Sequence, residues 1–432
     1  MTAPATLEIT DQFSDAYNQL EHSDDNLFIT GKAGTGKSTL LHHFRQTTTK
    51  NVVVLAPTGV AALNVRGQTI HSFFKFKPRF MDLERIKQRK PQRSFTQIDT
   101  LVIDEISMVR ADIFDGIEKF MRLNGPHIGA PFGGVQLCVF GDLYQLPPIV
   151  SQSERDVYSQ SYPSPYFFDA PAFKDADFNL LEMTDVYRQS DRVFITALDR
   201  IRTGQINGRL IDWINQRHLP ENTLFNQTPI VLCTTNRKAD NINQARLDAL
   251  PDSSQTFEGK VSGTFDAKDA RLPSPHSLEL KVGAQVMFTK NDKGKRWVNG
   301  TIGTITTLSS SKIIVAVTSA AGFTYDYEVE KENWESVAYE FSEAKGKIVE
   351  RVTGNYNQYP LILAWAVTIH KSQGKTLDSA IIDLDRGAFA SGQLYVALSR
   401  CRSMEGIILK QPIRERDIRV DPQVVRFMNN QR

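Results

Sequence analysis

Cysteine is scarce in this sequence of 432 residues, which contains only Cys138, Cys233 and Cys401. The three lie far apart, with no Cys-x-x-Cys pair and no histidine pair nearby, which argues against a disulfide framework and against a zinc site. No hydrophobic run approaches the roughly 18 residues that would span a bilayer, and residues 1–4 do not begin a signal peptide. We therefore expect reduced cysteines, no membrane partner and no secretion signal.

A strong net charge is also lacking, because 51 Lys and Arg residues face 49 Asp and Glu residues. The overall balance does not indicate a polyanionic partner, so any surface for nucleic acid must be local. One candidate is the segment 75–93, in which eight basic residues stand against two acidic ones and which begins among Phe74, Phe76 and Phe80. Such a run is more often a solvated face, and only its place between the motifs below makes it a candidate.

The length of the chain suggests two or three domains. Its first part alternates short apolar runs with helical patterns, which is typical of a parallel α/β sheet, and a second part of this kind begins near Asn179. Strands are expected at 27–30, 52–55, 101–104 and 136–140 in the first part, and at 229–233, 380–384 and 406–410 in the second. Between them, alternation at 301–308, 312–318, 324–329 and 337–341 predicts a small inserted antiparallel barrel.

Residues 31–38 read GKAGTGKS and match the phosphate-binding pattern G-x-x-x-x-G-K-[ST] between an apolar run and a helix start. The backbone N–H groups of such a loop close around phosphates at a helix N-terminus, where the helix dipole favours anions. Lys37 is expected to neutralise the β- and γ-phosphates, and the Ser38 hydroxyl to ligate Mg²⁺. The nucleotide-binding residues expected here are Gly31, Ala33, Gly34, Thr35, Gly36, Lys37, Ser38 and Thr39.

The apolar run at 101–103 ends in two carboxylates. Downstream of a phosphate-binding loop, this pattern predicts that Asp104 holds Mg²⁺ and that Glu105 activates the attacking water, which implies hydrolysis and not mere binding. Gln145, in the loop after the next expected strand, is placed to reach the γ-phosphate or that water.

The second α/β part has no phosphate-binding loop of its own. Residues 374–376 resemble the end of one, but Ile369 stands where its first glycine would be. One part therefore binds ATP, and the other should supply groups in trans. Phosphoryl transfer needs positive charge on the γ-phosphate, usually from an arginine finger, and Arg188 and Arg400 are the candidates.

Taken together, these segments resemble the PIF (petite integration frequency) DNA helicases, in the RecD-like branch of superfamily-one helicases. The order of the blocks carries the resemblance, and the blocks cover nearly the whole chain. They are 11–12, 31–38, 56–62, 69–74, 103–108, 131–136 running into 141–148, 187–189, 366–374 and 395–400.

The resemblance implies an α/β fold of two RecA-like (P-loop NTPase) domains with a small wedge insertion and an inserted SH3-like β-barrel. The first RecA-like domain would comprise 1–74 and 98–178, with the wedge insertion at 75–97. The second would comprise 179–256 and 354–432, with the barrel at 257–353.

The resemblance also assigns roles to single residues. It implies that Gln12 reads the adenine, that Gln145 senses the γ-phosphate, and that Arg188 and Arg400 reach across the cleft. Gln373 and Gly374 would lie near the phosphates. The blocks that line the single-strand channel in this family contain Thr58, Gly59, His71, Phe73, Thr368, His370 and Lys371; such a channel needs cations, hydrogen-bond donors and aromatic faces.

The implied function is an ATP- and Mg²⁺-dependent helicase that moves 5′-to-3′ on single-stranded DNA and opens forked or tailed duplexes. G-quadruplexes and RNA–DNA hybrids are further candidate substrates, and the setting would be genome maintenance, including DNA repair, recombination or telomere maintenance. We expect a monomer on DNA in the cytoplasm of a bacterium or a phage host, with the nucleus and mitochondrion left open.

Two other functions fit parts of the pattern. A P-loop ATPase could act as a switch or loader, although the two arginines and the second α/β part argue against this. A passive single-strand binding protein would explain the barrel and the basic segment, but not Glu105. No His-x-His pair or acidic cluster outside the ATPase motifs indicates a nuclease or relaxase.

Overall fold

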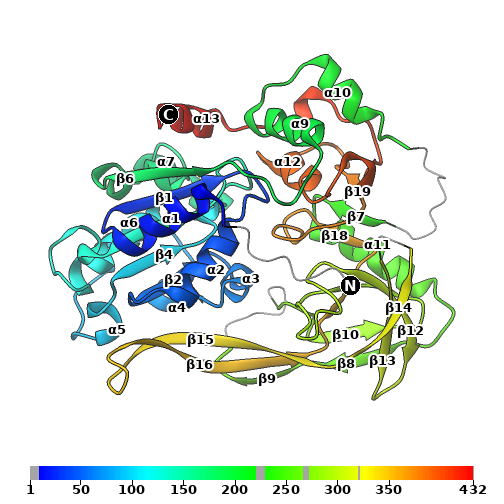
Figure 1. Cartoon of the computed structure of the whole chain (residues 1–432), viewed down its shortest axis with the longest axis horizontal. Helices are drawn as coiled ribbons and strands as arrows, with labels where there is room; N and C mark the ends of the chain where they lie inside the picture. Colours follow the sequence, from blue (N-terminus) through cyan, green and yellow to red (C-terminus); the bar gives the residue numbers. More distant parts are fainter. Residues whose placement is uncertain (1–8, 220–228, 266–271, 320–321, 432) are drawn as a thin grey trace.

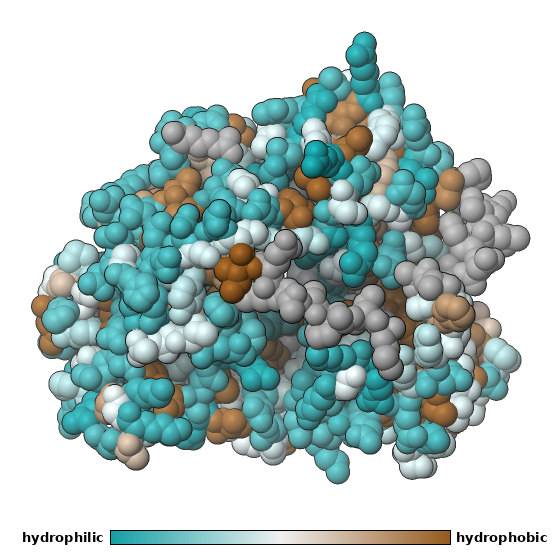
Figure 2. Space-filling view, in the orientation of Figure 1, coloured by the Kyte–Doolittle hydropathy of each residue, from teal (hydrophilic) through white to brown (hydrophobic). Residues whose placement is uncertain are grey.

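The computed structural model describes residues 9–219, 229–265, 272–319 and 322–431, so the expectation about residues 1–4 lies outside the described residues. Two parallel β-sheets, each with its own helices, lie next to one another, and a long antiparallel hairpin runs below them (Figure 1). This arrangement confirms the predicted α/β class with two sheet-centred halves and an inserted β domain. The face seen in Figure 2 is mostly hydrophilic, with hydrophobic side chains in small, separate groups.

The first sheet carries the phosphate-binding loop. Its strand order is β3-β2-β4-β5-β1-β6, with all printed pairings parallel. The strands are β1 (Asn26–Gly31), β2 (Val52–Ala56), β3 (Gln68–Thr69), β4 (Thr100–Ile103), β5 (Gln136–Phe140) and β6 (Phe178–Met183). One face packs on Phe13, Leu20 and Phe44 of the N-terminal helices, and the other on the larger aromatic core around Phe114 and Phe120. Because the strands are parallel, their carboxyl ends meet along one edge, where ligands bind in such sheets.

The helices are mostly short and have side-chain caps where the sequence offers Ser, Thr, Asp or Asn at the N-cap. Thr10 caps the first helix, Thr58 the third and Asp191 the ninth. The helices are α1 (Asp11–His22), α2 (Lys37–Thr47), α3 (Gly59–Asn64), α4 (Ile70–Phe74), α5 (Arg93–Thr96), α6 (Ala111–Asn124), α7 (Arg155–Ser161), α8 (Pro171–Asp175), α9 (Arg192–Thr203), α10 (Gly208–Asn215), α11 (Asn236–Asp248), α12 (Gln393–Leu398) and α13 (Pro422–Asn430).

Strand β6 corrects the predicted end of the first domain at residue 178. Residues 178–183 pair with β1 from Asn26↔Phe178 to Gly31↔Met183, so the first sheet continues to Met183. This edge strand is half-buried along most of its length. It therefore lacks the continuous apolar run that marked the central strands.

The second sheet has the order β18-β7-β19-β20 and is also parallel. Its strands are β7 (Ile230–Cys233), β18 (Ala366–Thr368), β19 (Ala380–Asp383) and β20 (Ile407–Leu409). Three of them lie within one residue of the predicted bounds. Strand β18 was not predicted, because three residues are too few to show a period.

Helix α13 corrects the predicted second domain at its C-terminal end. Val424 and Met428 are buried in the core of the first sheet, and Phe427 stacks on Phe168 with 4.3 Å between ring centroids. The Tyr166 hydroxyl donates to Asp421 at 2.9 Å, just before this helix. Residues 422–430 therefore pack with the first sheet, although they follow the last strand of the second.

The β insertion, defined here as strands β8 to β17, forms three antiparallel sheets. The strands are β8 (Gln255–Glu258), β9 (Lys260–Gly263), β10 (Ser277–Leu280), β11 (Gln285–Phe288), β12 (Ile302–Leu308), β13 (Ile313–Thr318), β14 (Thr324–Val329), β15 (Glu332–Ser342), β16 (Lys347–Gln358) and β17 (Leu361–Leu363). Strand β17 pairs with β11. The insertion therefore begins before residue 257 and runs past residue 353, where the sequence pattern had placed its limits.

The hairpin of β15 and β16 reaches from the insertion to the first sheet (Figure 1). The Tyr339 hydroxyl accepts from Val54 N at 3.1 Å and donates to Val54 O at 3.2 Å. Ion pairs join Arg45 to Glu350 and Arg93 to Glu343. The insertion thus contacts the first half of the molecule, although in sequence it interrupts the second, and the sequence alone did not indicate this contact.

Segment 75–97, the predicted wedge, has no core of its own. It contains a 3₁₀ turn (Leu83–Arg85) and the short α5, and its buried residues Met81 and Phe95 belong to the core of the first sheet. Phe76 and Phe80 also pack against that core. All eight basic side chains are exposed: Lys75, Lys77, Arg79, Arg85, Lys87, Arg89, Lys90 and Arg93. The aromatic side chains therefore face inward and the charges face solvent.

Membrane-spanning segments were searched for along the described part of the chain. None of its helices has the length and apolar character that crossing a bilayer would require.

Candidate nucleotide and nucleic-acid sites

The phosphate-binding loop joins β1 to α2, as the motif predicts. Gly31, Gly34 and Gly36 have φ values of +146°, +86° and +85°, which side chains rarely adopt. A Cβ on Gly31 would also lie 2.3 Å from Met183 O, and one on Gly34 would lie 2.6 Å from Arg188 Cβ. The loop is therefore closely packed against segment 183–189, and its glycines are required for this approach.

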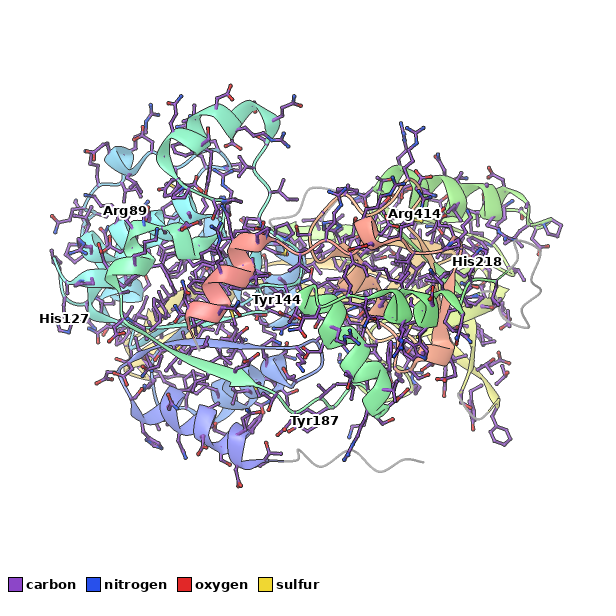
Figure 3. The ribbon with its side chains drawn as sticks, turned by 90° about the horizontal axis from the view of Figure 1, so that it is seen from above. Arg89, His127, Tyr144, Tyr187, His218 and Arg414 are labelled. Atoms are coloured by element: carbon purple, nitrogen blue, oxygen red, sulfur yellow. The ribbon has the colours of Figure 1, made fainter. Side chains whose placement is uncertain are left out.

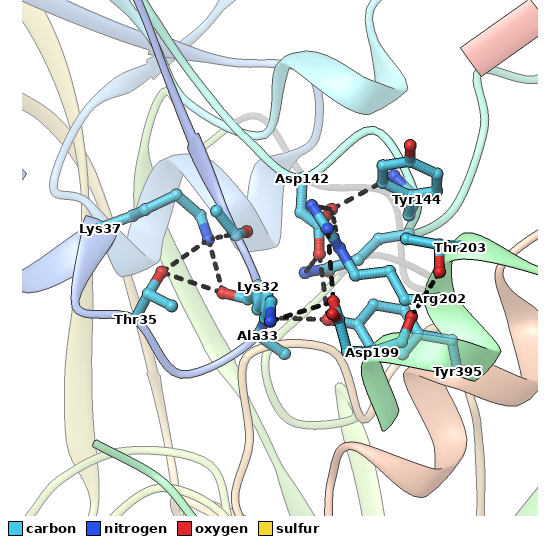
Figure 4. Close-up of polar contacts among 12 residues, drawn as sticks. Lys32, Ala33, Thr35, Lys37, Asp142, Tyr144, Asp199, Arg202, Thr203 and Tyr395 are labelled. Carbon is cyan, nitrogen blue, oxygen red and sulfur yellow. Dashed lines mark hydrogen bonds and ion pairs between the residues drawn. The ribbon is translucent and has the colours of Figure 1, made fainter. Parts of the chain in front are cut away.

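Lys37 is folded back onto its own loop. Its Nζ donates to Gly31 O at 2.7 Å and to Lys32 O at 3.0 Å, with Thr35 Oγ1 at 3.4 Å (Figure 4). Burial lowers the pKa of Lys37, and the carboxylates of Asp142 and Glu105 oppose that shift. A polyanion at the loop would offer the ammonium stronger partners than these neutral oxygens, because hydrogen bonds to charged acceptors are about twice as strong.

Asp104 and Glu105 follow β4 directly. Burial and the neighbouring Glu105 raise the pKa of Asp104 to about 7. Burial also raises the pKa of Glu105, although Lys37 and Arg400 oppose the shift. Asp104 and Glu105 are two adjacent, half-buried carboxylates, which suits a cation. A carboxylate with a hydroxyl and phosphate oxygens is the donor set that Mg²⁺ takes beside nucleotides. Asp104 and Ser38, the exposed second residue of α2, are the side chains here that could hold such an ion.

Gln373 joins the second half of the molecule to the first. Its Nε2 donates to Glu105 Oε2 at 3.2 Å and to Gln145 Oε1 at 3.0 Å. Gln145 in turn donates to Asp142 Oδ2 at 3.3 Å. Three of the predicted residues are therefore in contact, and the adjacent Gly374 follows with φ +78°.

Arg188 and Arg400 lie on the same side of the cleft and near each other. Arg188 Nη1 donates to Ser399 O at 3.3 Å, and Arg400 Nη2 donates to Ser399 Oγ at 2.8 Å. Burial, and then the nearby Arg188, lower the pKa of Arg400 to about 9. Neither guanidinium forms an ion pair with any described carboxylate. Two cations held this close, with no carboxylate paired to either, could hold an anion.

Sequence reasoning missed a buried network beside the loop. Arg202, on α9, donates twice to Asp142 Oδ1, at 3.0 and 3.1 Å, and lies over the Tyr144 ring (Figure 4). The Tyr395 hydroxyl donates to Asp142 Oδ2 at 3.2 Å and accepts from Ala33 N at 2.9 Å. Burial alone would raise the pKa of Asp142, but Arg202 and Lys37 hold it below its usual value. The network ties the loop to both α9 and α12, and its members lie up to 362 residues apart in sequence.

Gln12 and Tyr187 lie at the outer end of the loop. Gln12 Nε2 donates to Glu182 O at 2.8 Å and its Oε1 accepts from Thr184 N at 2.9 Å, which fixes the amide against the end of β6. Tyr187 N donates to Gly34 O, and the Tyr187 ring passes Gly36 while remaining 45% exposed. Figure 3 places Tyr144 and Tyr187 between the two halves. Tyr187 was in a quoted motif, but only the structure shows its ring available for stacking beside the loop.

Two residues predicted to contact nucleic acid are buried. Phe73 is 6% exposed and packs edge-on against Phe74 and Phe95 in the core, so in this structure its ring does not face solvent. Thr368 is 4% exposed, and its hydroxyl accepts from Lys371 N at 3.2 Å. Phe73 and Thr368 each lie in a motif next to residues that reach the surface. The motif alone does not show which of its side chains face solvent.

The other five predicted contact residues are at least partly accessible. Thr58 caps α3, and a Cβ on Gly59 would meet nothing within 4 Å. Lys371 is exposed, and burial lowers the pKa of the half-buried His370. Thr58 and Gly59 follow the carboxyl end of β2, His71 follows that of β3, and His370 and Lys371 follow that of β18. These are the same edges of the two sheets that carry the nucleotide residues.

Family models and curated relatives that match this chain are PIF1-like helicases, the family that its sequence motifs resemble. The PIF1-like helicase family model matches residues 8–210, and the model of the 2B domain of DNA helicase Pif1 matches residues 268–308. ATP-dependent DNA helicase Pif1 of Bdellovibrio bacteriovorus is 31% identical over 432 residues, covering 98% of this chain and 92% of its own. Human ATP-dependent DNA helicase PIF1 is 36% identical over 414 residues, covering 93% and 60%.

Solved structures match as well. A Bacteroides Pif1 helicase in complex with ADP-AlF3 and ssDNA has a TM-score of 0.70 and 34% identity, covering 98% of this chain and 97% of that one. The chain spans about 60% of the length of the vertebrate relatives it matches.

Proposed function

The chain belongs to the PIF1-like helicase family, and from this premise we propose that it is an ATP-dependent DNA helicase. It hydrolyses ATP between its two α/β halves, moves 5′-to-3′ along single-stranded DNA, and separates forked or tailed duplexes. The observation that carries the proposal is the contact of Gln373 with Glu105 and Gln145. It joins residues from both halves beside the phosphate-binding loop, as a motor driven by nucleotide requires.

The nucleotide chemistry follows from the groups around the loop. Lys37 exchanges the carbonyls of Gly31 and Lys32 for phosphate oxygens, while Arg188 and Arg400 turn from Ser399 toward the γ-phosphate. Ser38 and Asp104 would hold Mg²⁺, which neutralises the phosphates when bound. Glu105 accepts the proton of the attacking water, and Gln145 orients it. The amide of Gln12 and the ring of Tyr187 hold the base at the outer end of the loop.

Motion follows from the fact that the γ-phosphate bridges the two halves. When it is bound, positive groups from the second half are drawn to the loop of the first, and hydrolysis releases them. Thr58, Gly59 and His71 lie on the first half, and His370 and Lys371 on the second. If both groups hold one strand, each ATP cycle changes their separation and advances the strand. Phe73 and Thr368 support these surfaces from below.

The exposed cations of 75–93 suit the role of a wedge that meets duplex phosphates while the strands part. One copy of the chain carries the nucleotide groups and both strand-holding surfaces, which supports action as a monomer on DNA. Three buried, unpaired cysteines suit a reducing compartment that contains DNA, such as the bacterial cytoplasm.

G-quadruplexes and RNA–DNA hybrids are secondary substrates under this proposal.

The test is steady-state ATP hydrolysis with and without a single-stranded oligonucleotide. We expect single-stranded DNA to raise ATP turnover several-fold and blunt duplex DNA to do so far less, because only a free strand enters the channel. Rising salt should raise the DNA concentration needed for half-maximal stimulation, since phosphate contacts release counterions. Turnover that ignores single-stranded DNA would favour a switch or loader, and binding of DNA without any turnover would favour a passive binding protein.

A further inference from the structure

We propose that the hydrogen bond between Lys375 and Asn299 couples the β insertion to the nucleotide cleft, with Lys375 acting as a positioning residue for segment 372–376. This inference rests on the proposed function, because what it transmits is the stimulation of ATP turnover by DNA. Lys375 belongs to the second half of the molecule, and Asn299 to the loop between β11 and β12.

The ammonium of Lys375 is held by one neutral partner. Its Nζ donates to Asn299 Oδ1 at 2.6 Å, and it forms no ion pair with any described carboxylate. Burial lowers the pKa of Lys375 to about 8. Lys375 is half-buried, and a partly desolvated ammonium with a single neutral partner carries a cost that an apolar side chain of the same length would not have. The placement of a lysine here therefore points to the contact itself, and not to packing.

Hydrogen bonds within the insertion hold the loop that carries Asn299. Asn299 N donates to Asn291 Oδ1 at 2.7 Å, and the next residue, Gly300, donates from N to Phe288 O at 2.8 Å. Gly300 has φ +100°, and a Cβ on it would lie 3.4 Å from both Lys375 Cβ and Thr376 O. The backbone of the insertion thus approaches segment 372–376 closely, and a movement of strands β11 and β12 would displace that segment.

The same segment touches the catalytic groups at two points. Arg400 Nη1 lies 3.4 Å from Lys375 O, and Leu377 N donates to Arg400 O at 2.9 Å. Two residues before Lys375, the amide of Gln373 holds Glu105 and Gln145. Lys375, which is bonded to Asn299, is therefore only one contact away from Arg400 and two residues away from Gln373, which contacts Glu105.

The proposed action follows from this geometry. Under this proposal the DNA strand held by the two halves also contacts the β insertion, and that contact shifts Asn299. Asn299 then carries the Lys375 side chain with it, and segment 372–376 re-aims Gln373 and Arg400. Without the hydrogen bond between Lys375 and Asn299, the motor halves still bind and hydrolyse ATP at the basal rate. Their rate of ATP hydrolysis no longer rises when DNA is bound.

The experiment compares Lys375→Met with the wild-type protein in ATP turnover, with and without saturating single-stranded DNA. We expect the DNA-stimulated rate to fall at least about fivefold, the lower end of typical coupling between sites, while the DNA-free rate and the affinity for DNA stay within about twofold. Asn299→Leu should reproduce this loss, Asn299→Asp should retain stimulation because it keeps the acceptor, and the double variant Lys375→Met with Asn299→Leu should be no worse than either alone.

Lys281→Met is the matched control, because Lys281 Nζ also donates to a single neutral oxygen, Leu250 O, at 3.0 Å, and no hydrogen bond or ion pair of Lys281 in the described part of the chain reaches segment 372–376. It should leave both rates unchanged. Unaltered stimulation in Lys375→Met and Asn299→Leu would overturn the coupling, and so would an equal loss of the basal rate or a rise of that rate. If the wild-type protein itself shows no stimulation by DNA, the proposed function fails as well, which separates the two results.

Discussion

Replacing Lys37 with alanine is expected to lower the rate of ATP hydrolysis by at least about 100-fold, the range found when one charge-stabilising donor is removed from a buried site. The Lys37 ammonium lies inside the phosphate-binding loop, bonded to Gly31 O and Lys32 O, within the influence of Glu105 and Asp142. Alanine leaves the loop backbone intact but removes the charge that the β- and γ-phosphates need. The measurement is ATP turnover at saturating single-stranded DNA.

Lys32→Ala is the matched control, because Lys32 lies in the same loop but its Nζ pairs with Asp199 at 3.1 Å. This variant should lose far less activity than Lys37→Ala. A Lys37→Ala protein with near-normal turnover would contradict the assignment of the loop as the site of phosphoryl transfer.

Glu105→Gln separates hydrolysis from binding in the same site. Glutamine keeps the size of the side chain and its proximity to Gln373, but cannot accept the proton of water at neutral pH. Hydrolysis should fall as far as in Lys37→Ala, whereas a fluorescent ATP analogue should still bind. Loss of nucleotide binding in Glu105→Gln would show that Glu105 acts on the loop and not on the water.

The largest expected loss of stability comes from Arg202→Leu, at about 3–5 kcal/mol, the usual cost of leaving one member of a buried ion pair alone. Arg202 and Asp142 are each 1% exposed, and Arg202 supplies both of the short contacts to Asp142 Oδ1. Without it, the Asp142 carboxylate keeps only Tyr395, Gln145 and the backbone N–H of Tyr144 as neutral donors. The measurement is the midpoint of urea unfolding.

Two further variants control this prediction. Asp142→Asn combined with Arg202→Leu removes the unpaired charge, and should recover part of the lost stability. Arg351→Leu breaks the exposed pair with Glu340, and should change the midpoint little, because surface pairs contribute about 0–1 kcal/mol. If Arg202→Leu behaved like Arg351→Leu, the network would not hold the loop to α9 and α12.

The parts of the site that the sequence predicted are those coded by contiguous residues. A glycine pattern between strand and helix, and two carboxylates at the end of an apolar run, fix local geometry almost independently of the rest of the chain. The strands that carry them were therefore expected within one or two residues of their observed ends. The fold class followed from the order of such segments.

What could not be predicted depends on contacts between distant residues. No local pattern indicates that Arg202 pairs with Asp142, that Tyr339 bonds the backbone of Val54, or that α13 packs on the first sheet. The burial of Phe73 and Thr368 was not predicted either, because membership of a motif does not decide which side chains face inward. Strand β6 was missed because an edge strand needs no continuous apolar run.

Strand separation is the most direct test of the central claim. Two partial duplexes, one with a 5′ single-stranded tail and one with a 3′ tail, are incubated with ATP and Mg²⁺, with Lys37→Ala as the inactive control. The account predicts that the wild-type protein unwinds the 5′-tailed duplex only, and that Lys37→Ala unwinds neither. Unwinding of the 3′-tailed duplex alone would contradict the direction of travel, and ATP turnover without unwinding of either duplex would contradict the motor itself.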